Sequence, residues 1–239
     1  SSKRKNIMKS MIELNKTDNK VYTSRNFGDI IEPYNNSNTT LEVFIDFETL
    51  SAYKTSRIIN NVKKTYTGFI YLIGMFWKCP DTNKFIFDSF YCDNLNLLSE
   101  KEMINNWWNK VIQLKQKHNK NKIVLYHWSS AESNFLKKAF KRNNLDNIKT
   151  DLSSKTYELR DLMKIYVNDE ITIKNVWKYS LKSIARGLFD LGLIPEIWDS
   201  YSKGGDIIDG YNSIAAATNC YKYCKMSNTP ISTNYNFMS

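Results

Sequence analysis

The amino-acid sequence predicts an α/β protein with a mixed sheet, in which three antiparallel strands are followed by βα units and helices cover both faces. Two observations support this fold class. Short runs rich in aromatic and β-branched residues, which are typical of strands, recur in the first half of the chain. In the second half, segments with helical spacing of apolar residues alternate with strand-like runs, which is typical of helices packed on a sheet.

Three strands are expected in the first part of the chain. The first covers residues 43–47, and the next two cover 68–77 and 84–91. The five residues at 79–83, Cys-Pro-Asp-Thr-Asn, are typical of a turn, so the second and third strands are expected to form a hairpin.

Helices and one further strand are expected in the rest of the chain. Ser99 is the expected N-cap of a helix that reaches about residue 117 and has acidic residues in its first turn. A fourth strand is expected at 122–128 and a helix at 130–142. Two more helices are expected, one at 177–192 that ends at Gly192 and one at about 206–225.

The composition suggests one large domain and an anionic partner. At 239 residues, 42% of them hydrophobic, the chain can bury a full core. We expect a polar arm over residues 1–40 and one domain over 41–239, cut from a longer protein before its last motif. The net charge of +10 favours a polyanionic partner. No apolar run of 18 residues could span a membrane, and no secretory signal is evident.

The four cysteines indicate a reducing intracellular compartment, such as the cytoplasm, the nucleus or a viral factory, rather than a disulfide scaffold. Cys220 and Cys224 are four residues apart on an expected helix, while Cys79 and Cys92 flank an expected strand. A zinc site could be assembled from these thiols, but their spacing matches no known ligand pattern. Plain buried thiols are the favoured interpretation. The abundance of Asn, Lys, Ile and Tyr suggests an AT-rich genome, such as that of a large virus.

Two carboxylates lie in the middle of the first strand. Because side chains alternate along a strand, Asp46 and Glu48 are expected to share one face. Two acids on one face repel each other and resist desolvation unless a cation lies between them. Acids at this spacing are also common on exposed strands, so a solvated pair remains the alternative.

A third carboxylate, Glu132, lies where the fourth strand leads into a helix. With Ser129 it fits a capping box, in which the glutamate serves only the start of the helix. The alternative is that Glu132 supplies an oxygen ligand at the strand end, where the ligand sites of open α/β sheets collect. Between residues 110 and 149 there are ten basic residues and two acids, which suits a phosphodiester site but also a solvated basic face.

Two further segments contain charged candidates. The helix expected at 177–192 has an apolar stripe of Leu181, Ile184, Ala185 and Leu188, with Lys182 and Arg186 one turn apart on its other side. These two basic residues could meet a phosphate, although solvated positions on a core helix are favoured. Asp161 follows a short strand-like run, and Asp206 and Asp209 suit the first turn of the last expected helix.

Several short motifs, in this order, resemble those of a known family. They are Val-Phe-Ile-Asp-Phe-Glu-Thr-Leu, Tyr-Leu-Ile-Gly, Tyr-His-Trp-Ser-Ser-Ala-Glu, Asp-Leu-Met-Lys-Ile-Tyr and Tyr-Ser-Leu-Lys. Over residues 42–225 the pattern resembles the RNase H-like 3′–5′ exonuclease superfamily with four catalytic acids, the DEDD type. It is most similar to the ribonuclease-H-like domain found beside RecB-type nucleases and helicases. The proofreading domain of DNA polymerases is a rival, because Asp-Phe-Glu-Thr also opens such domains.

The resemblance implies a role for each matched residue. Asp46, Glu48 and Glu132 would be catalytic metal ligands, Asp161 a further and supporting metal ligand, and Tyr179, Lys182 and Arg186 nucleic-acid contacts. His127 is expected to be structural. The last motif, Tyr-Asn-x-x-Asp, is missing, because Tyr235-Asn236-Phe237-Met238 is followed by Ser239. The last acid is either replaced by serine or lies beyond Ser239, and the second interpretation is favoured slightly.

The activity implied by the resemblance is metal-dependent hydrolysis of phosphodiester bonds in DNA or RNA, from single-stranded 3′ ends. Two Mg²⁺ or Mn²⁺ ions would be the cofactors, because hard cations prefer carboxylate ligands. Partner helicase or nuclease domains of a replication or repair protein are expected, and no membrane. The alternative is a catalytically inactive RNase H-like module that only binds nucleic acid.

Overall fold

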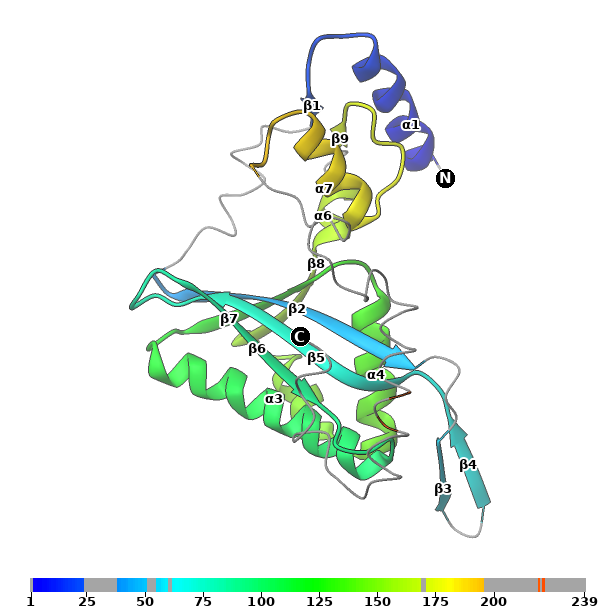
Figure 1. The fold of residues 1–239 in the computed structure, drawn as a ribbon, viewed down its shortest axis with the longest axis vertical. Helices are drawn as coiled ribbons and strands as arrows, with labels where there is room; N and C mark the ends of the chain where they lie inside the picture. The colour runs from blue at the N-terminus through cyan, green and yellow to red at the C-terminus, as the bar shows by residue number, and fades with distance from the viewer. Residues whose placement is uncertain are drawn as a thin grey trace. The chain divides into compact units, whose positions relative to one another are not determined.

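The computed structural model describes residues 2–23, 38–50, 55–59, 62–168, 171–195, 219 and 221. These residues belong to two compact units. One unit combines residues 1–36 with 161–202, and the other combines 37–160 with 203–239. Each unit is described separately, and Figure 1 shows the elements of both.

The larger unit contains a mixed five-stranded sheet, so the predicted α/β class is confirmed. The strands lie in the order β6-β5-β2-β7-β8. Their bounds are β2 (Thr40–Leu50), β5 (Phe69–Lys78), β6 (Phe85–Tyr91), β7 (Lys122–His127) and β8 (Tyr157–Asp161). β2 pairs antiparallel with β5 and β5 antiparallel with β6, whereas β2 and β7 are parallel. This is the expected arrangement of three antiparallel strands followed by a βα unit.

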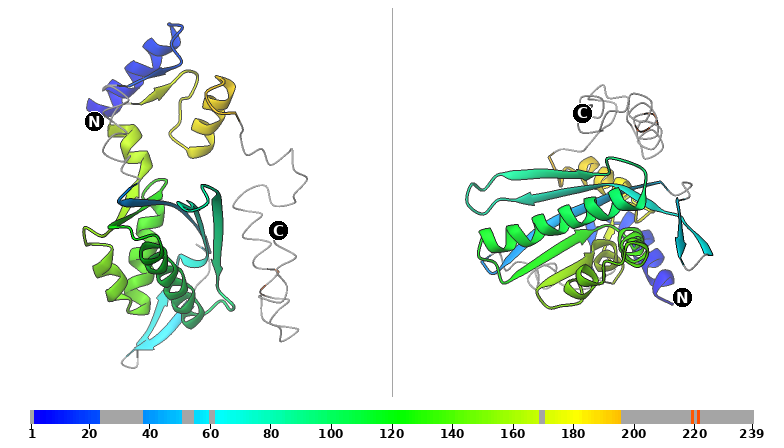
Figure 2. Two further views of the ribbon diagram at one scale, coloured as in Figure 1. Left: turned by 90° about the vertical axis from the view of Figure 1, so that its left-hand side faces the viewer. Right: turned by 90° about the horizontal axis from the view of Figure 1, so that it is seen from below.

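The helices of this unit are α3 (Leu97–Lys117), α4 (Ala131–Asn143) and α5 (Asp146–Asp151). α3 lies along one face of the sheet, as the view from below in Figure 2 shows. Its buried stripe includes Met103, Ile104, Trp107 and Val111, which pack in one hydrophobic core with the strands. A short hairpin of β3 (Thr55–Ile59) and β4 (Val62–Tyr66), which the sequence analysis did not identify, forms a separate two-stranded sheet.

The N-terminus of α3 differs from the expected one. Its N-cap is Asn96 rather than Ser99, and the Asn96 side chain accepts a hydrogen bond of 2.9 Å from the Ser99 backbone N–H. Both residues are suitable caps, but only an N-cap three residues earlier allows the helix to begin at Leu97. Glu100 lies in the first turn of α3, as expected for an acidic residue, but its side chain is fully buried.

Glu100 is the centre of a buried polar network that joins three elements. Arg142, at the end of α4, contacts both oxygens of the Glu100 carboxylate, one of them through Nε at 2.6 Å. Asn143 Nδ2 and the Ile70 backbone N–H also donate to this carboxylate, each at 2.8 Å. Arg142 in turn donates to the Gly68 carbonyl at 2.9 Å. Every part of the buried carboxylate therefore has a partner, which is the condition for burying a charge without a large penalty.

Gly68 has a backbone conformation that suits glycine. Its φ is +70°, and a Cβ placed there would lie 3.0 Å from Cε1 of Phe135. A left-handed conformation and a close ring contact both disfavour any other residue at the start of β5.

The smaller unit contains α1 (Ser2–Asn15), β1 (Val21–Tyr22), α6 (Leu162–Asn168), β9 (Thr172–Ile173) and α7 (Leu181–Asp190). β1 and β9 pair antiparallel, which brings together segments about 150 residues apart in the sequence. In α7 the expected stripe is only partly buried: Ile184 is buried, but Leu181 is 52% exposed. Gly187, which the expected stripe did not include, is also buried. A Cβ at this position would lie 2.0 Å from Cγ2 of Val176, so only glycine fits so close to this side chain.

Residues 2–23 differ from the polar arm expected for residues 1–40. α1 buries Ile7, Met11 and Leu14, which are four and three residues apart and so lie on one face of the helix. The spacing escaped the sequence analysis because the surrounding residues are mostly polar. Of the last helix expected at 206–225, only Asn219 and Tyr221 fall within the described residues, and both are helical.

We expect Glu100→Gln to lower the free energy of unfolding by about 3–5 kcal/mol, because Arg142 would keep a buried charge without its counter-ion. Urea denaturation followed by tryptophan fluorescence measures the difference. Glu102→Gln, an exposed change on the same helix, is the control and should alter stability by less than about 0.5 kcal/mol. Equal stability of the two variants would show that the network does not hold the fold.

Candidate active site

The side chains of β2 point alternately to a buried face of the sheet and to a face that is open to solvent. Leu41, Val43, Ile45 and Phe47 are buried, whereas the alternate residues are open to solvent, with Phe44 42% exposed. Asp46 is exposed and Glu48 is partly exposed, so the two acids share the open face as the alternation predicts. A register irregularity between Glu48 and Thr49 interrupts the pairing with β5 directly after the two acids. Irregularities of this kind commonly redirect side chains beside active sites.

The parallel pairing of β2 with β7 determines which residues meet. The paired register of the two strands ends at Phe44 opposite Tyr126. Asp46 lies two residues beyond this point on β2, and Glu132 follows the end of β7 in the first turn of α4. Both carboxylates therefore belong to the carboxyl ends of adjacent parallel strands, where the ligand sites of α/β sheets form.

The electrostatics of Asp46 indicate that Glu132 is close. Partial burial of the carboxyl group raises the pKa of Asp46 above its usual value, and the negative charge of Glu132 raises it further. The Phe47 N–H, which donates to Asp46 Oδ1 at 3.0 Å, opposes both effects. Asp46 keeps access to solvent, which screens part of the repulsion. A carboxyl group whose pKa is raised by a neighbouring carboxylate is typical of a cation site.

Glu132 has the environment of a ligand rather than of a helix cap. The N-cap of α4 is Ser130 rather than Ser129, which makes Glu132 the second residue of the helix and not the third residue that a capping box requires; Ser129 Oγ accepts a hydrogen bond of 3.3 Å from the Ala131 N–H. The Glu132 side chain is 12% exposed, and its Oε2 atom is buried without a hydrogen-bond partner. This oxygen lies 3.4 Å from Nδ1 of His127, whose side chain is 2% exposed. A buried carboxylate oxygen without a hydrogen bond fits a cation ligand.

A glycine on the neighbouring strand is paired with Asp46. The residue opposite Asp46 on β5 is Gly74, and opposite Gly74 on β6 is Ser89. A Cβ at Gly74 would be 3.4 Å from the ring of Phe87 and 3.8 Å from the Asp46 carbonyl oxygen. The Phe87 ring therefore lies over Gly74, and the missing side chain lets this ring pack close to the strand beside Asp46.

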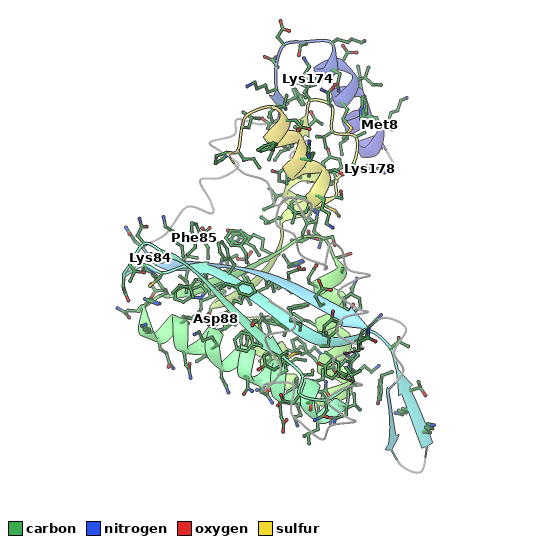
Figure 3. The ribbon with its side chains drawn as sticks, in the orientation of Figure 1. Met8, Lys84, Phe85, Asp88, Lys174 and Lys178 are labelled. Carbon is green, nitrogen blue, oxygen red and sulfur yellow. The ribbon has the colours of Figure 1, made fainter. Side chains whose placement is uncertain are left out.

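An aromatic row crosses the same face two residues away. Phe44 is paired with Tyr126 on one side and with Phe76 on the other, and Phe76 is paired with Phe87. The Phe44 and Tyr126 rings stack at 5.3 Å. Phe85 stacks on Phe76 at 4.9 Å, and Figure 3 shows Phe85 on the side of the sheet away from α3. Phe76, Phe85 and Phe87 are 40%, 60% and 65% exposed, which is unusual for phenylalanine and indicates a binding surface.

Three other acidic candidates lie outside β2 and α4. Asp161 is buried at the end of β8, and its Oδ1 accepts a hydrogen bond of 3.3 Å from the Lys164 backbone N–H. This bond connects Asp161 to the first turn of α6, and its role as a supporting metal ligand stays a prediction. Asp206 and Asp209 lie outside the described residues.

Tyr179, Lys182 and Arg186 also belong to the smaller unit. The Tyr179 hydroxyl donates to the Ile171 carbonyl at 3.0 Å, and Arg186 Nε contacts Asp190 Oδ1 at 2.9 Å. Lys182 and Arg186 are exposed. A pocket of about 400 Å³ is lined by Arg186, Trp177, Lys174 and Lys178, among others; Figure 3 labels the two lysines.

The three acids of the larger unit do not form a closed set of ligands. Among the described residues, the only three His, Cys, Asp or Glu side chains with ligand atoms all within 4.8 Å of one another are Cys79, Asp81 and His118. A site for two ions, which lie about 4 Å apart, spreads its carboxylates more widely than a site for one ion. The sequence analysis missed the second cluster because 36 residues separate Asp81 from His118, and only the fold brings them together.

The comparison with protein families agrees with this geometry. Residues 61–208, more than half of the chain, match a family model of the RNase H superfamily, and the chain belongs to that superfamily. The match begins after Asp46 and Glu48, so it supports the fold and not these two residues. No curated protein matches the sequence significantly. None of the helices in the described part of the chain has the length and apolar character needed to cross a membrane.

We expect Glu132→Gln to lower the pKa of Asp46 by removing the neighbouring negative charge, although not to its usual value, because burial still raises it. A raised pKa means that the folded state binds more protons than the unfolded state between the two pKa values. Stability should therefore fall as pH rises through that window, and less steeply in the variant. Titration of the Asp46 carboxyl carbon by NMR measures the pKa. Glu102→Gln should leave it unchanged, and an unchanged pKa in Glu132→Gln would mean that the two acids do not interact.

Proposed function

We propose that this chain is a metal-dependent nuclease, a 3′–5′ exonuclease of the DEDD type that acts on single-stranded ends of DNA or RNA. The observation that carries the proposal is the position of Asp46 and Glu132 just beyond the point where the parallel pairing of β2 with β7 ends, where the charge of Glu132 raises the pKa of Asp46, in a chain of the RNase H superfamily. Members of this superfamily are usually nucleases and generally use divalent metals. A role in a replication or repair protein with RecB-type partner domains is part of the same proposal.

The residues present fit a divalent metal. Asp46, Glu48 and Glu132 offer only oxygen ligands, which suit Mg²⁺ or Mn²⁺. The buried Oε2 of Glu132 lacks a hydrogen bond, and a cation would compensate its charge. In this proposal two ions are held by these acids, with Asp161 in support. When bound, such ions activate the attacking water and stabilise the leaving oxygen.

The remaining residues of the site position these groups. His127, almost fully buried, lies within 3.4 Å of Glu132 and limits the orientations of its carboxylate. Gly74 lets the Phe87 ring pack close to the strand beside Asp46, which brings the aromatic row next to the acids. A bound cation would reduce the repulsion between the Asp46 and Glu132 carboxylates, so this repulsion favours binding of a cation.

The aromatic row suits a single strand of nucleic acid. Unpaired bases stack on exposed aromatic rings without regard to sequence. Phe44, Phe76 and Phe87 are paired with one another across three neighbouring strands. The pair of Asp46 and Gly74 lies two residues further along the same strands. That separation is about 7 Å, close to the spacing of neighbouring nucleotides along an extended strand. Lys78, with Nζ 5.7 Å from the Phe85 ring centre, adds a positive charge.

The basic residues of the smaller unit are proposed as further nucleic-acid contacts. Lys174, Lys178 and Arg186 line one pocket with Trp177, which is 58% exposed. Cations beside an exposed aromatic ring favour both phosphate contact and base stacking. Tyr179 and Lys182, adjacent in sequence to this pocket, complete the proposed surface.

One observation favours the alternative of an inactive nucleic-acid-binding module. No Tyr-Asn-x-x-Asp sequence occurs between residues 1 and 239, so a fourth acid is not assigned. An RNase H-like domain without its fourth ligand would keep the fold and the basic surface but lose the chemistry.

The experiment that tests the proposal measures cleavage of end-labelled single-stranded DNA and RNA with Mg²⁺ or Mn²⁺. The samples are this chain and the complete product of its gene, each with Asp46→Asn and Glu132→Gln variants. We expect stepwise removal of 3′ nucleotides that requires the metal and falls at least about 100-fold in either variant, because each change removes a charged ligand.

The matched control is Asp93→Asn, an exposed change in the loop after β6, which should leave the rate unchanged. Cleavage that survives Asp46→Asn would place the chemistry elsewhere. Salt-sensitive binding without cleavage by any folded sample would support the inactive module instead.

The aromatic surface makes a separate prediction about binding. We expect Phe87→Ala to weaken binding of single-stranded DNA by about 5- to 100-fold, because one stacked base contributes about 1–3 kcal/mol. Fluorescence anisotropy with a labelled oligonucleotide measures the affinity. Leu98→Ala removes an apolar side chain of similar exposure, 64% against 65%, from α3 and should have no effect. Equal affinities of the two variants for the oligonucleotide would show that the open face of the sheet does not bind single-stranded DNA.

A further inference from the structure

A second cluster of ligand-type side chains lies in the larger unit, away from the acids. Cys79 and Asp81 belong to the turn between β5 and β6, and His118 is the C-cap residue of α3. Their ligand atoms all lie within 4.8 Å of one another, and Asp81 Oδ2 is 3.3 Å from His118 Nδ1. Tetrahedral Zn²⁺ with ligands at about 2.0–2.3 Å places neighbouring ligand atoms about 3.3–3.8 Å apart. The cluster therefore needs only small side-chain movements to reach that geometry.

The burial of His118 points to a ligand. Its side chain is 0% exposed, and neither Nδ1 nor Nε2 makes a hydrogen bond, although Asp81 Oδ2 lies 3.3 Å from Nδ1. A buried imidazole nitrogen without a partner is costly, and such groups in native proteins call for an ion or a bonded neighbour. The Trp77 ring, 5.5 Å from the imidazole, packs against the histidine but offers it no acceptor.

The turn that holds the other two ligands is well ordered. The Cys79 N–H donates to the Lys84 carbonyl at 2.8 Å, and the Asn83 N–H donates to the Cys79 carbonyl at 2.8 Å. Asn83 has a left-handed φ of +56°, which closes the turn. Cys79 is buried and is not in a disulfide, whereas the Asp81 side chain is 62% exposed. The cluster is thus closed on the protein side and open to solvent at Asp81, which provides an entry path for an ion.

We propose that Cys79, Asp81 and His118 bind one Zn²⁺ ion, with water as the fourth ligand. A thiolate, an imidazole and a carboxylate form the mixed donor set that zinc accepts and that Mg²⁺ does not. The ion would fasten the β5–β6 turn to the C-terminus of α3. This site is independent of the proposed nuclease centre, because Cys79 lies five residues along the chain from Gly74, or about 17 Å along a strand.

The test measures zinc bound per chain by elemental analysis, after chelator treatment, loading with Zn²⁺ and dialysis. Co²⁺ loading provides a second readout, since a cobalt–thiolate bond gives a charge-transfer band in the near ultraviolet. We expect one ion per chain and the cobalt band in the unmodified protein. We expect at least tenfold weaker binding in Cys79→Ser and in Asp81→Asn, and loss of the band in Cys79→Ser.

Controls separate this site from other thiols and from the acids. Cys92→Ala removes a buried thiol that bonds the Ile70 carbonyl and should keep both signals. Asp46→Asn and excess Mg²⁺ should also leave the cobalt band unchanged. Because Asp81 is exposed, Asp81→Asn should fold normally, which circular dichroism checks. Unchanged zinc content in both Asp81→Asn and Cys79→Ser, or no binding by the folded protein, would overturn the proposal.

Discussion

The buried carboxylate of Glu100 is the interaction on which the sheet unit depends most. It joins α3, the end of α4 and the start of β5 through Arg142, Asn143 and the Ile70 N–H. Each partner compensates part of a charge that has no access to water, so none can leave without a large cost. Because α4 is held at its C-terminal end by this network, its N-terminal turn has a defined position. That turn carries Glu132, so the network indirectly determines the candidate active site.

The two faces of the sheet have different physical tasks. One face packs against α3 and supplies the core, with Val43, Ile73, Met75 and Leu125 among its buried residues. The other face carries aromatic rings and carboxylates that remain open to solvent, with a glycine between them. A rigid core under an open polar and aromatic surface is a good support for a binding site, since the strands keep the spacing of the side chains. Partial burial and the nearby charge of Glu132 raise the pKa of Asp46 on that surface.

The two candidate metal sites differ in the kind of ligand as well as in position. The acids at the ends of β2 and β7 offer oxygen atoms alone, whereas the cluster at the β5–β6 turn offers sulfur, nitrogen and oxygen. Hard and borderline cations distinguish these sets by chemistry, not by shape alone. In the two proposals, the acids suit an exchangeable Mg²⁺ or Mn²⁺ ion, whereas the cluster at the β5–β6 turn suits a tightly bound Zn²⁺ ion.

The α/β class, the hairpin of the second and third strands and the shared face of Asp46 and Glu48 were predictable from the sequence. All three follow from local spacing, because side-chain period and turn residues are recognised within a few positions. Other features depend on the folded arrangement. The burial of Glu100, the packing of α1, the environment of Glu132 and the cluster of Cys79 with His118 all join segments distant in the sequence. No local pattern encodes such contacts, since they depend on which faces the whole fold brings together.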